Sequence, residues 1–455
     1  MRLLGWLCLV ASCANVSVET DRGSIFEHGD AHVAATFGQV PDVPEGPLDD
    51  EVIRALDTLT DGGLEAGVWG RETSRALESL ARARDPRVAW PLVDLLRFVS
   101  DHVILRELSA TVGRILGLDL GSFDRFRRAT DHLLAWDVPA PPGYLSWKRA
   151  MFLRVEPAWN RLMVPGAVDW RWVTWGGVRI DDRPFGETDQ PCDCIPAADL
   201  PVTTSGAEAT WLDDDDVVFG IVVGDEARAY PRRIMEVREM VNDVLGGRSL
   251  AIPYCTLCAS AQAWLTGLGN DESIRLVWRT SGLLSRSNKL SYDLESGSVF
   301  DTFTGRALTG PLYELGIHLE AVGVVTTSFG AWRRDHPETT VLAEELALGR
   351  DFDFRRGRDA DGPIFPVGDV DPRLPVQADV LGAVTQSGRP IAFPIDHARA
   401  ALLAGEEIRV ENLVVELDGD GLRAVDADGT DVGSHQAFWF AWSQFHPRTD
   451  VWVRR

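Results

Sequence analysis

Cysteine and positive charge are both scarce in this chain. Six cysteines occur among 455 residues, and 45 lysines and arginines stand against 69 aspartates and glutamates, which gives a formal net charge of −24. A protein that binds nucleic acid needs a basic surface for the phosphates, so this balance argues against a nucleic-acid partner. The sequence also lacks a phosphate-binding glycine loop and a dinucleotide-binding glycine motif, and we therefore expect no nucleotide cofactor.

Apolar runs long enough to cross a membrane are missing too. Met1-Arg2 is a short basic region, residues 3–10 form a short apolar segment, and Val10-Ala-Ser-Cys13 is followed by polar sequence. This arrangement resembles the lipobox of bacterial lipoprotein signal peptides. The resemblance implies that residues 1–12 are a cleaved signal peptide and that Cys13 carries a lipid. We therefore expect an extracytoplasmic protein anchored through Cys13 to the cell membrane or outer membrane; an uncleaved anchor and an ordinary secretory signal are the alternatives.

Four cysteines remain once Cys8 in the signal peptide and Cys13 at the lipid are set aside. They form two close pairs, Cys192-x-Cys194 and Cys255-x-x-Cys258. Outside the inner membrane, free thiols tend to be oxidised unless a metal or a reducing partner holds them. These two pairs are therefore the first candidates for chemistry.

A chain of this length is expected to fold as two or three domains. Residues 13–46 are polar without a sustained period and are predicted to be a tether. Residues 47–140 have helical periodicity, residues 165–345 alternate short β-branched runs with glycine turns, and residues 346–455 form a second half without cysteine. The sequence predicts an α+β protein, in which an N-terminal helical segment is followed by a mainly β, internally duplicated module.

The helical pattern is clearest between residues 71 and 116. Apolar residues recur at helical spacing in Arg71–Arg84, Pro86–Val99 and Asp101–Leu116, and Asp85 is placed to cap the second helix. This second stretch resembles a helix of a HEAT-type repeat, although any short helical bundle has the same apolar stripe. We expect the segment to serve in packing, or in docking a protein partner, rather than in catalysis.

The second half of the β module echoes the first. Gly224-Asp-Glu-Ala-Arg-Ala-Tyr-Pro231 corresponds to Gly388-Arg-Pro-Ile-Ala-Phe-Pro394, and residues 329–339 correspond to residues 440–449, each carrying Ala-Trp and then His-Pro-x-Thr. Where the first half carries the cysteine strand, the second carries Glu411-Asn-Leu-Val-Val-Glu-Leu417. A duplicated scaffold with its chemistry in one copy is the simplest interpretation, and chance matching of short strings is the alternative.

Several separated motifs occur in one order along the β module. They are Ala227-Arg-Ala-Tyr-Pro231, Val241-Asn-Asp243, Tyr254-Cys-Thr-Leu-Cys258, Ser281-Gly-Leu-Leu284, Tyr292-Asp293, and Trp332 with His336-Pro337. Together they resemble a large bacterial and archaeal family known only as a domain of unknown function, whose central motif is Tyr-Cys-Pro-Leu-Cys-Gly. The resemblance covers roughly residues 181–453 and implies export, but no established activity.

Four residues, at three places in the sequence, depart from the usual pattern of that family. Arg238-Glu239 stands where many members have His-Glu, Ala259 replaces the glycine after the second cysteine, and Ser285-Arg286 replaces Tyr-Asn. Loss of the histidine removes a metal ligand or proton carrier, so the chemistry of the family is expected to be altered in this chain.

Metal binding is the leading interpretation of the cysteines. A set of four thiolates suits zinc and a smaller set suits copper, and the candidate ligands are Cys192, Cys194, Cys255 and Cys258. If the two pairs do not meet, a two-thiolate site completed by His318 or His336 would suit copper.

Two alternatives use the same cysteines. Cys255 and Cys258 have the spacing of a dithiol oxidoreductase, in which one thiol attacks and the other resolves, although no thioredoxin-like βαβ unit surrounds them. Alternatively, the cysteines form structural disulfides in a cell-envelope interaction protein. In that case Cys192–Cys194 is the less favourable bridge, because a C-x-C ring is tight.

A group of polar residues lies close to the cysteine motif in the sequence. Its members are Arg228, Arg238, Glu239, Asn242 and Asp243. They are expected to form either a pocket beside the cysteines, with Glu239 as a general base, or a buried hydrogen-bond network that fixes the fold.

Overall fold

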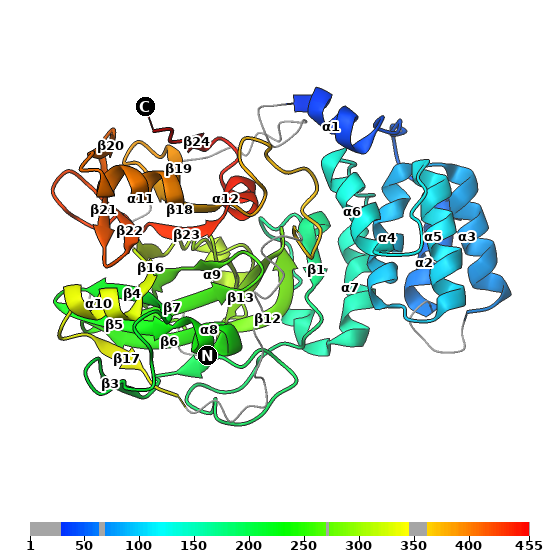
Figure 1. Cartoon of the computed structure of the whole chain (residues 1–455). Coiled ribbons are helices and arrows are strands. Elements are labelled where there is room, and N and C mark those ends of the chain that lie inside the picture. The colour runs from blue at the N-terminus through cyan, green and yellow to red at the C-terminus, as the bar shows by residue number, and fades with distance from the viewer. Residues whose placement is uncertain (1–28, 63–68, 270–272, 345–361, 455) are drawn as a thin grey trace.

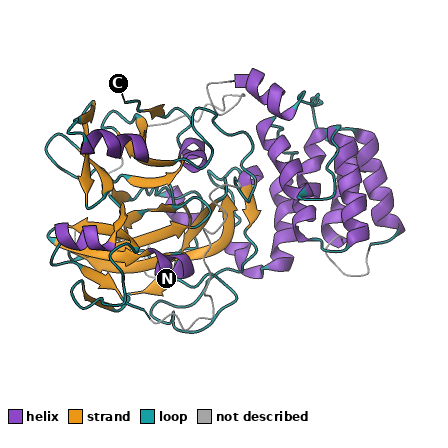
Figure 2. Ribbon diagram, viewed as in Figure 1, coloured by secondary structure: helices purple, strands orange, loops and turns teal. Residues whose placement is uncertain are grey.

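The computed structural model describes residues 29–62, 69–269, 273–344 and 362–454. The predicted signal peptide, Cys13 and the first part of the predicted tether lie outside the described residues. Figure 1 shows a block of helices beside a larger block of strands, and Figure 2 shows that only short helices accompany the strands. Within the described ranges, no helix has the length and apolar character that crossing a membrane requires.

The helical block is organised around helix α4. Its elements are α1 Gly29–Phe37, α2 Asp50–Gly62, α3 Arg71–Ala83, the 3-10 turn Pro86–Val88, α4 Ala89–Phe98, α5 His102–Leu116, α6 Arg125–Ala135 and α7 Tyr144–Val155. Helix α4 is buried from Ala89 to Leu96 and packs against α2, α5, α6 and α7. Asp85 accepts the backbone N–H of Arg87, so it caps this helix as predicted, with a 3-10 first turn.

Three sheets make up the first part of the β block. One has the order β1 Val173–Trp175, β12 Trp278–Ser285, β13 Asn288–Asp293, β14 Val299–Asp301. The second has the order β15 Glu320–Val322, β9 Ala263–Leu265, β7 Arg248–Cys255, β6 Met240–Leu245, β2 Ala198–Asp199, and β8 Ser260–Ala261 pairs with β7. The third has the order β16 Val325–Ser328, β4 Val217–Val223, β5 Glu226–Pro231, β17 Thr340–Leu342, β3 Thr203–Ser205. The smaller pair β10 Gly267–Leu268 and β11 Ile274–Arg275 lies beside them.

Two sheets make up the C-terminal part. They are β23 His435–Phe438, β18 Asp379–Val384, β19 Pro390–Pro394, β24 Asp450–Val451, and the three-stranded sheet β20 Ile408–Val410, β21 Leu413–Asp418, β22 Gly421–Val425. Short helices follow the strands: α8 Arg232–Arg238, α9 Gly310–Glu314, α10 Phe329–Asp335, α11 Ile395–Leu403 and α12 Trp439–Phe445.

The predicted internal duplication is confirmed strand by strand. The order β16-β4-β5-β17 in the first copy matches β23-β18-β19-β24 in the second, with the first two pairings antiparallel and the last parallel in both. Helices α8 and α11 follow the equivalent strands β5 and β19, and α10 and α12 follow β16 and β23. The cysteine strand β7 corresponds to the cysteine-free strand β21, so the α+β class and the duplicated module are both as expected.

In each copy, a tryptophan packs against a glycine of the central strand. Trp332 of α10 lies over Gly220 of β4, and Trp442 of α12 lies over Gly382 of β18. A Cβ atom added at these glycines would come within 2.4 Å and 2.1 Å of the tryptophan rings. Only glycine therefore allows the helix to lie this close to the sheet.

Both copies then end in the same turn. The indole N–H of Trp332 donates to Thr339, and that of Trp442 donates to Thr449, each over 2.9 Å. His336 and His446 lie against these indoles, with ring centroids 3.8 Å and 4.1 Å apart. The recurring Trp and His-Pro-x-Thr residues are thus structural, which explains why the repeat was visible in the sequence.

Replacing Gly382 by alanine tests this packing. The new Cβ would collide with the Trp442 ring, so we expect the free energy of unfolding, measured with urea, to fall by at least about 2 kcal/mol. Gly388→Ala is the matched control: its φ is +83° but nothing lies within 4 Å, so only a backbone cost of about 1 kcal/mol is expected. Equal losses in the two variants would contradict the proposed packing.

Candidate functional site

The four cysteines form two separate pairs. Cys192 and Cys194 are joined in a disulfide, whereas Cys255 and Cys258 are free and buried. Across the described ranges, the ligand atoms that gather in a group of three or more within 4.8 Å belong to Asp181, Cys192 and Cys194. This group has the composition of a metal site, but the other two cysteines do not join it, so the four sulfurs do not meet.

The expectation that Cys192–Cys194 is the less favourable bridge is wrong. The chain turns at these residues, which brings their Cα atoms to 5.1 Å, within the range that disulfides accept. The backbone N–H of Arg179 donates to the carbonyl of Asp193 and holds the turn. The local backbone turn therefore brings the two cysteines close enough to form the bridge.

Strand β7 delivers Cys255 to a turn that also holds Cys258. All of β7 after its first residue is buried, and the N–H of Cys258 donates to the carbonyl of Cys255 over 3.2 Å. Both thiols are directed at one acceptor, the carbonyl of Ser287, at 3.8 Å from Cys255 and 3.5 Å from Cys258. The two sulfurs are thus gathered on one side of the turn.

Ser287 lies at the tip of the β12–β13 hairpin, which is a strained two-residue turn. Arg286 and Ser287 have φ values of 53° and 62°, as a type I′ turn requires, although glycine and asparagine suit such positions better. The guanidinium of Arg286 lies 3.8 Å from the Trp172 ring and donates to Gln444. These contacts fix the carbonyl that the two thiols share.

A buried ion pair between Glu239 and Lys289 lies beside Cys255. The ammonium of Lys289 contacts a carboxylate oxygen of Glu239, and the hydroxyl of Thr256 donates to the other oxygen over 3.2 Å. Glu239 caps the C-terminus of α8 in the left-handed conformation, with φ of 51°. Strained residues therefore surround the free cysteines on two sides, as is common at functional sites.

Lys289 is a site residue that no sequence motif indicated. The chain has only two lysines, Lys148 and Lys289, among its 45 positive residues. Both are buried and paired, Lys148 with Asp94 over 2.7 Å and Lys289 with Glu239. In a chain that otherwise uses arginine, this scarcity was the signal that could have singled out Lys289.

The two free thiols are electrostatically unequal. Burial and, to a smaller extent, the charge of Glu239 raise the pKa of the Cys255 thiol. The hydrogen bond from Cys258 and the charge of Lys289 outweigh them, so this pKa lies below its usual value. Burial and the neighbouring Cys255 raise the pKa of Cys258 well above its usual value. Cys255 is therefore the sulfur that ionises first.

Cys255 also lines a cavity of about 280 Å³. The polar groups of its wall include Cys255, Glu239, Lys289 and Thr280. The apolar residues of the wall are Val178, Ile195, Leu257, Leu283, Leu284, Leu290, Ile364 and Phe365. A small apolar pocket with a few convergent polar groups and a thiol of lowered pKa is the usual form of a substrate site.

The helical block holds one wall of this cavity. Ile364 and Phe365 belong to the segment before β18, and Arg127 of α6 donates to the carbonyl of the adjacent Pro363 over 2.8 Å. The carboxylate of Asp131, also in α6, accepts hydrogen bonds from the backbone N–H groups of Val367 and Gly368, which follow Phe365 closely in the sequence. The helices thus help to position the wall of the site.

Of the five polar residues near the motif, Glu239 alone lines this cavity. The other four form buried contacts elsewhere: Arg228 pairs with Asp243 over 2.6 Å, Asn242 donates to Asp199 over 2.9 Å, and Arg238 pairs with Glu344 over 2.5 Å. The two histidines considered as ligands are also engaged, His318 with the carbonyl of Thr304 and His336 with Asp418. Both interpretations of the polar cluster therefore hold in part: Glu239 lies in a pocket beside Cys255, and the other four residues form buried hydrogen bonds and ion pairs.

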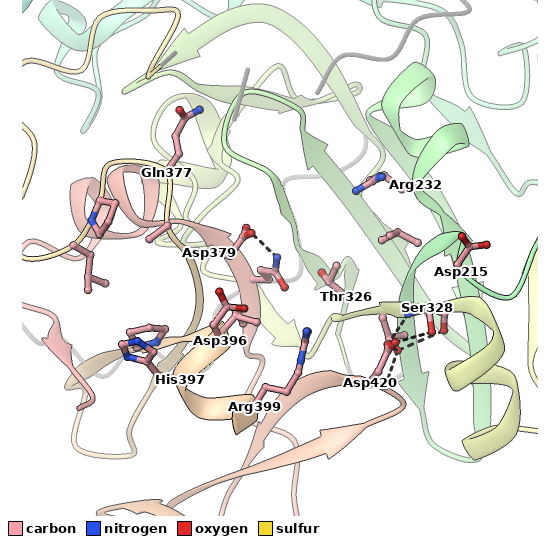
Figure 3. Close-up of a pocket in the computed structure, with 18 of the residues that line it drawn as sticks. Asp215, Arg232, Thr326, Ser328, Gln377, Asp379, Asp396, His397, Arg399 and Asp420 are labelled. Carbon is pink, nitrogen blue, oxygen red and sulfur yellow. Dashed lines mark hydrogen bonds between the residues drawn. The ribbon is translucent and has the colours of Figure 1, made fainter. Parts of the chain in front are cut away.

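A larger cavity of about 910 Å³ separates the two copies of the β module. Figure 3 shows Arg232 of α8 and Arg399 of α11 reaching into it, with Asp215, Asp396 and Asp420 around them. Its wall carries mixed charges, and the described residues that line it include no cysteine. The reactive thiol belongs to the smaller cavity.

A family model described as "Protein of unknown function (DUF3179)" matches residues 192–434, more than half of the chain. The chain belongs to this family. The match begins at Cys192 and includes all the free-cysteine site, so the resemblance drawn from the motifs is confirmed. No curated protein and no solved structure matches the chain.

Two of the residues that depart from the expected motif have an unfavourable backbone conformation in the structure. Ala259 and Arg286 both have left-handed φ values, 49° and 53°. Glycine and asparagine, the residues expected at these two positions from the motif resemblance, adopt that conformation at the lowest cost. This DUF3179 protein therefore carries backbone strain on both sides of its thiols.

Restoring the motif glycine should relieve the strain. We expect Ala259→Gly to raise the free energy of unfolding by about 0.5–1 kcal/mol, because the φ of 49° no longer opposes a Cβ. Ala261→Gly, two residues on in strand β8, is the control and should lower it. Thermal or urea unfolding distinguishes the two, and destabilisation by Ala259→Gly would refute the assignment of strain.

Proposed function

We propose that this protein is a dithiol–disulfide oxidoreductase in which Cys255 is the attacking residue. The observation that carries the proposal is the unequal placement of the two free thiols. Cys255 lines a cavity and has a lowered pKa, whereas Cys258 is fully buried and has a raised pKa. Exchange chemistry needs this difference, because the attacking sulfur must be a thiolate in reach of the substrate and the resolving sulfur acts second.

The proposed exchange has two steps. The Cys255 thiolate attacks one sulfur of a disulfide R–S–S–R, so a bond forms between Cys255 and RS, the original S–S bond breaks, and RS⁻ leaves. Cys258 then loses its proton and attacks Cys255 Sγ, which forms the Cys255–Cys258 disulfide and releases the second RS⁻. The protein gives up two electrons to the substrate, and the two thiolates take one proton from Cys258 and one from solvent.

Lys289, Glu239 and Ser287 support the first step. The positive charge of Lys289 favours the thiolate form of Cys255. Glu239 fixes the position of Lys289 and is itself held by the hydroxyl of Thr256. In the reduced resting state the Ser287 carbonyl accepts from both thiols and keeps the two sulfurs on the same side of the turn. Once Cys255 is a thiolate, only Cys258 retains a proton to donate to this carbonyl.

Metal binding at the other cysteine pair is a second candidate. The ligand atoms of Asp181, Cys192 and Cys194 lie within 4.8 Å of one another, and reduction of the disulfide would give thiolates suited to zinc or copper. Asp181 already accepts from Arg183 and from the N–H of Ala197, so a metal would have to compete with these bonds.

We expect the protein to take up one zinc ion only after this disulfide is reduced, as measured by equilibrium dialysis and elemental analysis. Cys192→Ser should abolish the uptake, with Cys258→Ser as the matched variant that keeps it. Zinc uptake that persists in Cys192→Ser, or no uptake after reduction, would contradict this candidate.

We also propose that the protein works outside the cytoplasm, tethered by a lipid on Cys13. The Cys192–Cys194 disulfide supports this location, since disulfides persist mainly in oxidising compartments. Docking of a protein partner on the helical block stays a prediction.

A titration with 2,2′-dithiodipyridine tests the exchange. The reduced dithiol in the soluble Cys13→Ser mature form, with Cys192–Cys194 intact, should release two equivalents of thiopyridone. It should end with a Cys255–Cys258 disulfide and no bound pyridyl group. Cys258→Ser should release one equivalent and retain a pyridyl group, because nothing resolves the mixed disulfide. Intact mass and absorbance measure both quantities.

Cys255→Ser provides the matched comparison, and its initial rate should fall at least tenfold because the lowered-pKa thiolate is gone. Melting curves check that each variant is folded. Equal rates for the Cys255→Ser and Cys258→Ser variants would refute the assignment of the attacking residue.

A further inference from the structure

We propose that the substrate of Cys255 is a small, uncharged, apolar disulfide and not a disulfide within a protein. This inference rests on the proposed exchange chemistry and specifies its substrate class. It follows from three features of the cavity: its access, its wall and its charge.

Access to the thiol is narrow. Cys255 is 2 % exposed and Cys258 is fully buried, so the attacking sulfur is reached through the cavity of about 280 Å³. Thiol–disulfide exchange requires the attacking sulfur to contact a substrate sulfur directly. Pockets for drug-sized ligands have volumes of about 300–1,000 Å³, so this cavity takes a molecule at or below the lower end of that range, and a polypeptide loop does not fit.

The wall of the cavity is mainly aliphatic and aromatic. Leu257, Leu283, Leu284 and Leu290 come from the cysteine turn and the β12–β13 hairpin, and Phe365 comes from the segment that the helical block holds. Such a surface gains free energy by covering apolar groups, at roughly 25 cal/mol per Å² removed from water. The alkyl or aryl groups beside the substrate disulfide are the natural occupants of this space.

The charges in the cavity are already paired. Lys289 and Glu239 form an ion pair, and Thr256 donates to the second carboxylate oxygen. Apart from the Cys255 thiolate itself, the described lining residues offer no further charged group to a charged substituent of the substrate. A carboxylate or ammonium group would lose its hydration without compensation, which disfavours its entry.

Ile364 is the residue best placed to control entry. It lines the cavity and is 44 % exposed, so it lies where the cavity meets solvent. Replacing it by a larger or a smaller side chain should change access to Cys255 without disturbing the buried thiols. Leu403, which is 71 % exposed on α11 and absent from the cavity wall, is a matched control position.

The experiment compares two disulfides of similar size, uncharged bis(2-hydroxyethyl) disulfide and dianionic 3,3′-dithiodipropionate, together with the larger, charged oxidised glutathione. Rate constants are measured for the full soluble Cys13→Ser protein and for a synthetic peptide of residues 250–260, which reports the intrinsic reactivity of the same motif. The ratio of uncharged to dianionic rates should be at least tenfold higher for the protein than for the peptide. Oxidised glutathione should be disfavoured further.

Variants at the entrance should move these rates in opposite directions. Ile364→Trp should slow reaction with the uncharged disulfide at least tenfold, and Ile364→Ala should raise the rate with oxidised glutathione, while Leu403→Trp should change neither. If the protein and the peptide show the same ratio, or if Ile364→Trp reacts at the unaltered rate, the substrate class is wrong although the exchange chemistry stands. If the protein exchanges with none of the disulfides, the proposed function fails, and this inference fails with it.

Discussion

The site depends on one backbone carbonyl that two thiols share. Ser287 presents this carbonyl from a hairpin tip with two consecutive left-handed residues, and Cys255 and Cys258 approach it from a turn that also contains a left-handed alanine. Neither turn is built from the residues that suit such backbone best. The strain persists because the surrounding core fixes both turns, and the result is a pair of sulfurs with unequal surroundings.

The remaining parts of the molecule can be understood as supports for this arrangement. The second copy of the β module packs around the cysteine turn, where Phe438 donates its N–H to the carbonyl of Cys258 and Gln444 accepts from Arg286. The helical block, through Arg127 and Asp131, holds the segment that closes the cavity. A helical segment and a cysteine-free half therefore both contribute to chemistry that is located in the first half.

Local sequence patterns predicted the scaffold well. The duplication was visible because Trp332 and Trp442 each need a facing glycine and a threonine acceptor, and these partners recur at fixed spacing. The cap at Asp85 was equally local. The C-x-x-C pair was found, but the sequence offered no way to tell that it would stay apart from the C-x-C pair, because their separation in space depends on how the sheets pack.

The charged partner of Cys255 was not predicted, because it comes from a distant strand. Lys289 follows Cys255 by 34 residues and reaches it only through the turn of the β12–β13 hairpin. The roles of the polar residues near the motif also depend on tertiary structure and could not be predicted. Glu239 lines the cavity, whereas Asn242 and Asp243, on the next strand, form hydrogen bonds with neighbouring strands. Sequence proximity identified the neighbourhood but not the geometry.

The central claim, that Cys255 is the reactive thiolate and Cys258 its protected partner, is tested most directly by site-resolved alkylation. The folded protein is treated with iodoacetamide between pH 6 and 9, and labelling of each cysteine is followed by peptide mass spectrometry. Because its pKa is lowered, Cys255 should be labelled first. As the pH falls, its labelling rate should begin to decrease at a lower pH than the rate of an ordinary thiol. Cys258 should be labelled only on unfolding. Equal labelling of both cysteines, or faster labelling of Cys258, would contradict the account.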